Sequence, residues 1–292
     1  MPIGKEDKIF YFINTLILLA VIVVIAVPII NVIANSFSDG DAVAAGKITF
    51  WPVDFSLEGY KAVFEDKYIL IGYGNTIFYT VVGTLINVVV TVIAAYPLSR
   101  KQLPGRNVIM MLFAFTMIFN GGLIPNFLLV KDLGMYNTRW AMIIPGAISV
   151  YNMVICRTFF ATNLPDELRE AAEVDGCSEF RFFIRMALPL SKAVIAVIAL
   201  YYAVAHWNAF FNAFIYLTNK NLYPLQLILR DVLISNTVNA SDVVSSDSIV
   251  NYNLVETLKY SLIMVSCIPI WCVYPFVQKY FVKGVMIGAI KG

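Results

Sequence analysis

Six long apolar segments limit what this chain can fold into more than any motif does. A bilayer core about 30 Å thick takes roughly 20 apolar residues of α-helix to cross. Each segment has about that length, and 60% of the 292 residues are hydrophobic, against about half in soluble proteins. We therefore predict an all-α integral membrane protein with a single domain, residues 1–292. The predicted spans cover about residues 9–33, 74–96, 108–130, 140–161, 193–217 and 258–281.

The distribution of Lys and Arg predicts the orientation of these spans. With the N-terminus in the cytoplasm, the short cytoplasmic loops and termini collect most of the basic residues, among them Arg100, Lys101 and Arg106. The basic residues of the other side lie mostly in two long loops, residues 35–72 and 219–255, which count least in this rule. We therefore expect both termini to face the cytoplasm.

The residues present exclude several function classes. The sequence has no Gly-x-x-x-x-Gly-Lys-Ser/Thr, so the chain has no P-loop of its own for ATP hydrolysis. His206 is the single histidine, and Cys156, Cys177, Cys267 and Cys272 lack metal-ligand spacing. We therefore predict no metal site and four reduced cysteines. No basic tract is long enough for a nucleic-acid-binding patch.

The longest polar run between two apolar spans covers residues 163–189 and predicts two short helices. Asn163 can cap the first helix, because Asn side chains accept N–H bonds at helix N-termini. Pro165 lies near the first turn, where a missing N–H costs little. Gly176 follows Asp175 as a left-handed stop, because it has no Cβ to clash.

A second short helix is expected after Gly176. Ser178 can cap it, and Pro189 should end or kink it before the next span. One face of this helix is apolar and another is basic. The apolar face holds Phe180, Phe183, Ile184 and Ala187, and the basic face holds Arg181 and Arg185. We predict a helix–glycine–helix hairpin that another protein binds; the alternative is a solvated loop with ordinary capping residues.

Interruptions in the apolar spans indicate a path through the membrane, because irregular backbone at membrane depth must be buried in protein or line a cavity. The third predicted span is interrupted by Asn120-Gly121-Gly122 and Pro125, and the fifth has amides at helical spacing with Tyr201. Aromatic rings with amides suit a sugar; the alternative is packing between helices. The candidate pathway residues are Asn120, Tyr151, Asn152, Tyr201, Trp207, Asn208 and Asn212.

The polar run also carries a specific resemblance. Glu170-Ala171-Ala172, three residues, Gly176, nine residues and Met186-Ala187-Leu188-Pro189 resemble the EAA loop of bacterial ABC importer permeases. Further segments, such as residues 133–138 and Trp207-Asn208, are similar to the carbohydrate-uptake, MalG-like permeases and to their LplC/YtcP-type oligosaccharide branch. The likeness covers nearly the whole chain.

The resemblance implies a complex in the bacterial cytoplasmic (inner) membrane. A second homologous permease, two ATPase subunits that bind ATP and Mg²⁺, and an extracytoplasmic solute-binding protein are the implied partners, besides lipid and the carbohydrate. Glu170 would face a basic group of the ATPase, and the tail from Lys283 to Gly292 would reach the ATPases. The implied coupling residues are Glu170, Ala171, Ala172, Gly176, Phe180, Phe183, Ile184, Leu188 and Pro189.

The predicted function is therefore the permease subunit of an ATP-driven importer for carbohydrate, in the oligosaccharide class, which works by alternating access and is not itself an enzyme. Two other classes are open to test. A self-sufficient secondary transporter needs a charge near the membrane midplane, but the acidic residues lie outside the spans. An intramembrane hydrolase with a Ser–His pair is supported only by His206.

Overall fold

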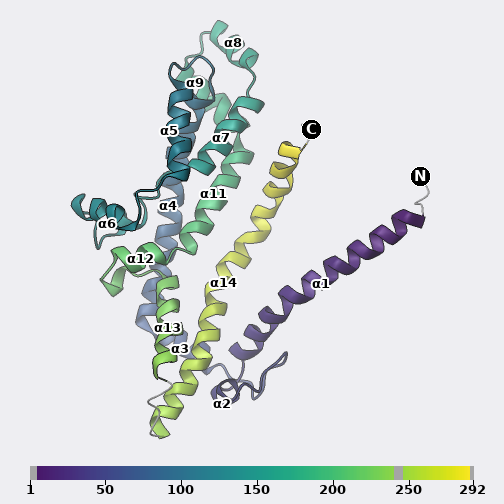
Figure 1. Ribbon diagram of the computed structural model, residues 1–292, viewed down its shortest axis with the longest axis vertical. Helices are drawn as coiled ribbons and strands as arrows, with labels where there is room; N and C mark the ends of the chain where they lie inside the picture. The colour runs from purple at the N-terminus through teal and green to yellow at the C-terminus, as the bar shows by residue number, and fades with distance from the viewer. Residues whose placement is uncertain (1–4, 240–245, 290–292) are drawn as a thin grey trace. The chain divides into compact units, whose positions relative to one another are not determined.

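The structure is a computed structural model that describes residues 5–239 and 246–289. The described part is mostly helical and has no β-strand beyond an isolated bridge between Ser38 and Phe55. Three helices are long and apolar enough to cross a membrane, and two bent helix pairs raise that number to five at most (Figure 1). The three are α1 (Lys5–Ser36), α4 (Lys67–Ser99) and α14 (Ser246–Ala289). The prediction of a helical membrane protein is confirmed at this level.

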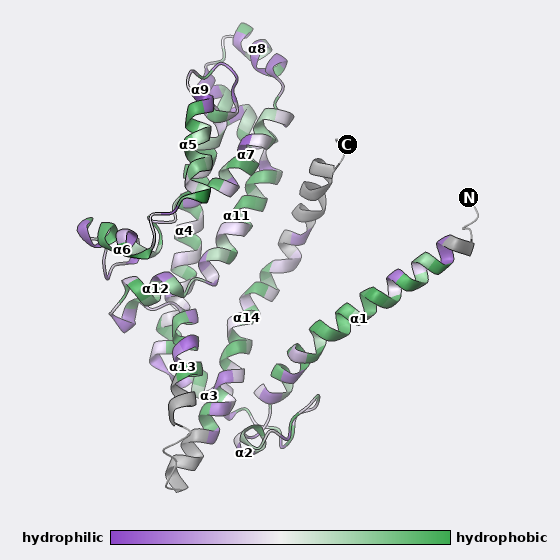
Figure 2. Ribbon diagram, viewed as in Figure 1, coloured by the Kyte–Doolittle hydropathy of each residue, from purple (hydrophilic) through white to green (hydrophobic). Residues whose placement is uncertain are grey.

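The apolar character of the long helices explains why these segments are helical. In lipid no water can bind free backbone groups, and a helix satisfies all of them within one segment. Figure 2 shows hydrophobic residues along most of α1. None of the most apolar 18-residue window of α1 is buried within the chain, as expected of a helix whose apolar side chains are covered by lipid or by another membrane protein.

The chain divides into two compact units. The first comprises residues 1–69 and 229–269, and the second comprises residues 70–228 and 270–292. In the first unit, the short helices α2 (Gly40–Ala44) and α3 (Glu58–Glu65) follow α1. A Cβ on Gly59 of α3 would lie 2.4 Å from the Ser261 Oγ of α14, so the absence of a side chain there allows α3 and α14 to pack closely.

The second unit holds the largest apolar core. Its helices include α5 (Arg106–Ile118), α7 (Val150–Asn163) and α11 (Lys192–Trp207), beside α4 (Figure 1). The core residues of these helices include Ala95, Met153, Cys156, Phe160 and Ile198, all inaccessible to solvent. At the other end of α4, the Asn75 amide and the Tyr79 hydroxyl donate to carbonyls of residues 221–223. That contact places η3 (Lys220–Leu222) and the start of α13 (Leu225–Asn239).

Three predicted spans are interrupted in the structure. The third consists of α5 and α6 (Leu123–Asp132), which are bent by 114° at residues 119–122, where the glycine break was predicted. The fifth consists of α11 and α12 (Phe211–Tyr216), separated by residues 208–210. In the fourth, a short 3₁₀ helix, η1 (Arg139–Met142), and seven non-α-helical residues precede α7. The expected continuous helix from Trp140 is therefore wrong in its first turns.

Prolines were expected to end the second span before Pro97 and to break the last span at Pro269 and Pro275, and these expectations are wrong. Helix α4 continues past Pro97 to Ser99, and α14 continues through Pro269 and Pro275. Proline removes one hydrogen bond and introduces a clash. Membrane helices tolerate it, because neighbouring groups and small local adjustments satisfy the freed carbonyl. Residues 290–292 of the C-terminal segment lie outside the described residues.

Candidate functional site

The polar run between α7 and α11 folds into the predicted helix–glycine–helix hairpin. Helix α8 (Asp166–Val174) ends before Gly176, whose φ of 74° is left-handed and favours glycine. The Ser178 Oγ accepts from the Arg181 N–H and caps α9 (Glu179–Phe182). The chain continues through a π-helical turn, η2 (Phe183–Ala187), and α10 (Leu188–Leu190). It bends by 77° before α11, close to Pro189.

The predicted cap of the first hairpin helix is wrong. Asn163 is the last residue of α7, and its Nδ2 donates to the Phe159 carbonyl one turn back in the same helix. The N-cap of α8 is Pro165, which makes no side-chain cap bond. The short polar side chain of Asn can bond to its own helix as readily as to the next one. Asp166 and Glu167 do occupy the first turn of α8, where the helix dipole favours acidic groups.

One side of the hairpin is buried in the core of the second unit. Ala172 of α8 and Phe182 of α9 are 8% and 1% exposed, and Ala187 is fully buried. They pack in the same cluster as Tyr96 of α4 and Phe160 of α7. Ala172 and Ala187 are small, which allows the backbone of the hairpin to approach these helices closely.

The predicted apolar face of the second hairpin helix is divided. Ala187 is buried, and the ring of Phe183 lies 4.7 Å from that of Tyr96, but Phe180 is 73% exposed and Ile184 46%. Phe182, which the spacing did not place on this face, is the buried anchor. The π-helical turn from residue 183 adds a residue to the helical repeat, and so changes which side chains share a face.

The other side of the hairpin presents a mixed apolar and charged surface, which we call the outer face. Val174 is 89% exposed and, with Phe180 and Ile184, gives the outer face three large apolar side chains. Exposed residues of both charges surround them. These are Glu170, Asp175, Arg181 and Arg185, with the small Ala171. Exposed apolar side chains rimmed by polar ones are typical of protein–protein interfaces.

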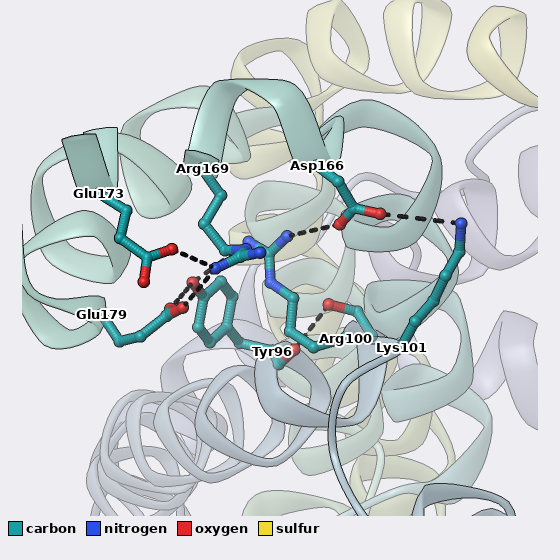
Figure 3. Close-up of polar contacts among 8 residues, drawn as sticks. Tyr96, Arg100, Lys101, Asp166, Arg169, Glu173 and Glu179 are labelled. Carbon is teal, nitrogen blue, oxygen red and sulfur yellow. Dashed lines mark hydrogen bonds and ion pairs between the residues drawn. The ribbon is translucent and has the colours of Figure 1, made fainter. Parts of the chain in front are cut away.

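An ion pair network joins the two helices of the hairpin (Figure 3). The Arg169 guanidinium of α8 lies 3.0 Å from the Glu173 carboxylate and 3.4 Å from that of Glu179 on α9. Desolvation lowers the pKa of Arg169, but Glu179 and Glu173 together raise it above its usual value. Arg169 therefore stays charged and holds α8 and α9 together across the Gly176 turn.

A second part of the network ties the hairpin to the end of α4 (Figure 3). The Arg100 Nη1 lies 4.0 Å from the Asp166 carboxylate, and its Nη2 donates to the Tyr96 hydroxyl. The Tyr96 hydroxyl donates in turn to the Glu179 carboxylate. Lys101 also lies 3.7 Å from Asp166 but is exposed. In the sequence, Arg100 served only to predict the orientation of the spans. The available sign of a further role was its position one helical turn after an aromatic residue, Tyr96, at the end of a predicted span.

The structure does not bring the predicted pathway residues together on one face. The Asn208 Nδ2 donates to the Val204 carbonyl at the end of α11, and Asn212 belongs to the separate helix α12. The break at residues 208–210 therefore removes the shared face that was expected. Trp207 is buried, with its ring edge-on to that of Tyr73.

The other candidate pathway residues lie at helix ends and breaks. The Asn120 Oδ1 accepts from the Gly122 N–H and the Asn126 amide, and so shapes the break between α5 and α6. Tyr151 is exposed and Asn152 buried, in the first turn of α7. Their role as sugar contacts stays a prediction.

His206 packs against α4. Its Nε2 is 2.8 Å from the Asn87 Oδ1 of α4, and the Asn87 Nδ2 donates to the Gly146 carbonyl. A Cβ on Gly83 would lie 2.4 Å from that nitrogen, so the glycine makes room for the imidazole ring. The Nε2 partner is an amide and not a serine, which gives no support to a Ser–His hydrolase.

The exposed hairpin of this helical membrane protein offers a partner protein an apolar surface rimmed by charges. The chain is a member of the family described as binding-protein-dependent transport system inner membrane component, which matches residues 87–286. It is 42% identical to Protein LplC of Bacillus subtilis (strain 168) over 289 residues, which are 99% of this chain and 97% of that protein.

Two further relatives agree with this family. The polygalacturonan/rhamnogalacturonan transport system permease protein YtcP of Bacillus subtilis (strain 168) is 39% identical over 94% of this chain and 96% of its own length. A chain in the crystal structure of a bacterial ABC transporter involved in the import of the acidic polysaccharide alginate superposes with a TM-score of 0.85. It is 34% identical over 95% of this chain and 98% of that one. The predicted resemblance to sugar ABC permeases is confirmed.

Proposed function

We propose that this chain is the permease subunit of an ATP-binding-cassette importer for oligosaccharides, and that residues 163–189 couple it to a separate ATPase. The observation that carries this proposal is the outer face of the hairpin, where Val174, Phe180 and Ile184 are exposed beside charged groups. A partner that covers this face would bury those side chains, which is the main driving force of protein association.

In the proposed assembly, two ATPase subunits bind ATP and Mg²⁺ in the cytoplasm. A second homologous permease completes the membrane domain, and an extracytoplasmic binding protein delivers the sugar. The chain crosses the membrane six times, with both termini and the hairpin on the cytoplasmic side. The bent pair α5–α6, the separate helices α11 and α12, and the interrupted segment before α7 supply the spans that are not continuous helices.

The proposed mechanism is alternating access. ATP binding closes the ATPase dimer and moves the docked hairpin, which transmits the displacement to the membrane helices. The chain itself supplies no bond chemistry; its part is to change which side of the membrane the sugar site faces. Coupling requires that the ATPase states differ in their contacts with the outer face, because a partner shifts an equilibrium only by its differential binding.

The substrates of the relatives favour an acidic oligosaccharide. The printed name of YtcP gives polygalacturonan and rhamnogalacturonan as its substrates, and the transporter of the crystal structure is involved in the import of alginate, an acidic polysaccharide. We propose an acidic oligosaccharide for this chain. Tyr151, Tyr201, Trp207 and the amides of Asn120, Asn152, Asn208 and Asn212 are the groups we propose along its route.

Uptake by whole cells tests the proposed substrate. A strain that lacks this chain should lose uptake of labelled oligogalacturonides or oligoalginates of two to four sugars, and a plasmid copy should restore it. Uptake of neutral oligosaccharides of equal length is the control and should not change. Loss of neutral oligosaccharide uptake alone would contradict the proposed acidic substrate but would still agree with an oligosaccharide importer. Unchanged uptake of every oligosaccharide would contradict the proposed substrate and the proposed importer function.

A further inference from the structure

We propose that Arg100 is a positioning residue that fixes the hairpin to the end of α4, so that α4 moves with the hairpin when the ATPase moves it. This inference rests on the proposed function. It adds a polar connection to α4, besides the chain connections from the hairpin to α7 and to α11 and the apolar packing of the hairpin on Tyr96 and Phe160.

The geometry places Arg100 between the end of α4 and both helices of the hairpin (Figure 3). Asp166, 4.0 Å from Arg100, is the first residue of α8. Glu179, which Arg100 reaches through the Tyr96 hydroxyl, is the first residue of α9. Both bridging distances at the hydroxyl are 3.2 Å. The Arg100 side chain therefore interacts, directly or through Tyr96, with carboxylates in the N-terminal turns of two helices. The helix dipole favours carboxylates at these positions.

Burial makes this contact difficult to break. The Arg100 side chain is 10% exposed, and its Nε is buried with no hydrogen bond partner. Its guanidinium lies 4.7 Å above the Tyr96 ring and 5.6 Å from that of Phe182, which adds cation–π attraction at a largely dry site. Moving the hairpin away would break the Asp166 ion pair and the contact with the Phe182 ring at the same time. The hairpin and the end of α4 are therefore expected to move together.

The two chain connections cannot fix the hairpin by themselves. On one side, Leu164 and Pro165 are non-helical. On the other, the chain bends by 77° at Ser191 before α11. Neither connection is a continuous α-helix that would fix the angle of the hairpin. The Arg100 contact, together with the apolar packing on Tyr96, opposes rotation of the hairpin.

The end of α4 is well placed to pass the displacement on. Arg157 of α7 donates to the Leu98 carbonyl, and the Thr91 hydroxyl bonds to that of Tyr202 on α11. Further along α4, Asn87 holds the Gly146 carbonyl in the interrupted segment before α7. A shift of α4 therefore reaches this break, which is a place where the membrane segment can bend.

The test is the coupling ratio of the purified complex of this chain with its ATPase and second permease, reconstituted in proteoliposomes. We measure oligosaccharide transported per ATP hydrolysed, with the yield of complex as a separate readout. In Arg100→Gln we expect the complex to form at normal yield, since the outer face is unchanged, and the ratio to fall by about tenfold. Arg106→Gln is the matched control, because it removes the same charge from the first residue of α5, where the Arg106 guanidinium donates to the neighbouring Asn107.

Two further variants separate positioning from folding. Arg100→Lys keeps the charge near Asp166 but loses the planar fork and ring stacking, so we expect partial recovery of the ratio. Tyr96→Phe keeps the ring and removes only the hydroxyl bridge to Glu179, so the ratio should fall less than in Arg100→Gln. A wild-type ratio in Arg100→Gln, or in both milder variants if Arg100→Gln fails to fold, would overturn the proposal. A wild-type chain that binds no ATPase would instead overturn the proposed function.

Discussion

Replacing Gly176 with Trp is expected to abolish ATP-dependent transport while the chain itself still folds. Gly176 has a φ of 74°, and among the described residues no heavy atom beyond its two chain neighbours lies within 4 Å of a Cβ built on it. Within this chain the substitution therefore costs only backbone strain, about 1–2 kcal/mol. In the assembly, an indole would occupy space that we assign to the ATPase, and overpacking costs about 1–3 kcal/mol more. The strain is the same in the free and the docked chain, so the overpacking alone weakens docking, by up to about 150-fold.

The matched control for this prediction is Gly176→Asn. Asn tolerates the left-handed conformation better than other residues and is much smaller than Trp, so uptake should stay close to wild type. The measurement is initial uptake rate per amount of chain in the membrane, with thermal unfolding of the purified chain to show that both variants fold. If the Trp variant transported at the wild-type rate, the hairpin could not be the docking site.

Reversing the charge of Glu170 is the second large effect. Glu170 is exposed on α8, so Glu170→Lys should leave the stability of the isolated chain nearly unchanged. Against a basic group of the ATPase, the new lysine would place two like charges at a desolvated contact. Loss of a buried ion pair costs about 3–5 kcal/mol, so we expect binding of the ATPase to weaken by at least about a hundredfold.

Titration of the detergent-solubilised chain with purified ATPase measures this loss as a change in Kd. Glu65→Lys is the control: Glu65 is also an exposed acidic residue in a short helix, paired with Lys61, but our topology places it on the opposite side of the membrane. Its Kd should equal that of wild type. An unchanged Kd in Glu170→Lys would remove Glu170 from the interface and leave the apolar outer face as the only support for docking.

The sequence predicted best those features that depend on local conformation. The left-handed Gly176, the Ser178 cap and the bend near Pro189 are each determined by one residue and its immediate neighbours, and the structure confirms all three. The break at residues 120–122 was likewise visible, because two glycines interrupt an apolar run. Length and hydropathy sufficed for α1, α4 and α14, since the bilayer thickness sets the required length.

Features that depend on tertiary contacts could not be derived from the sequence. The helical period places Asn212 on the same face as Tyr201 only if one helix contains both residues. The structure breaks that helix after Trp207, and the sequence could not show the break because residues 208–210 contain no glycine or proline. The sequence pattern placed Phe180 and Phe183 on the apolar face of the second hairpin helix, but Phe182 is the buried side chain. The π-helical turn at residues 183–187, which the sequence did not predict, changes which side chains share a face. Arg100 and Asp166 lie far apart in the sequence, so nothing local shows that they meet. Such pairs form only when the core around Phe160 and Phe182 is packed.

Purification of this chain in mild detergent from its native membrane tests whether it works as part of an ATP-driven complex. We expect an ATPase and a second permease to copurify with the wild-type chain, and ATP to drive oligosaccharide uptake after reconstitution. Gly176→Trp should lose the ATPase, and Gly176→Asn should retain it. A chain that purifies alone and still transports an oligosaccharide without ATP would contradict the account.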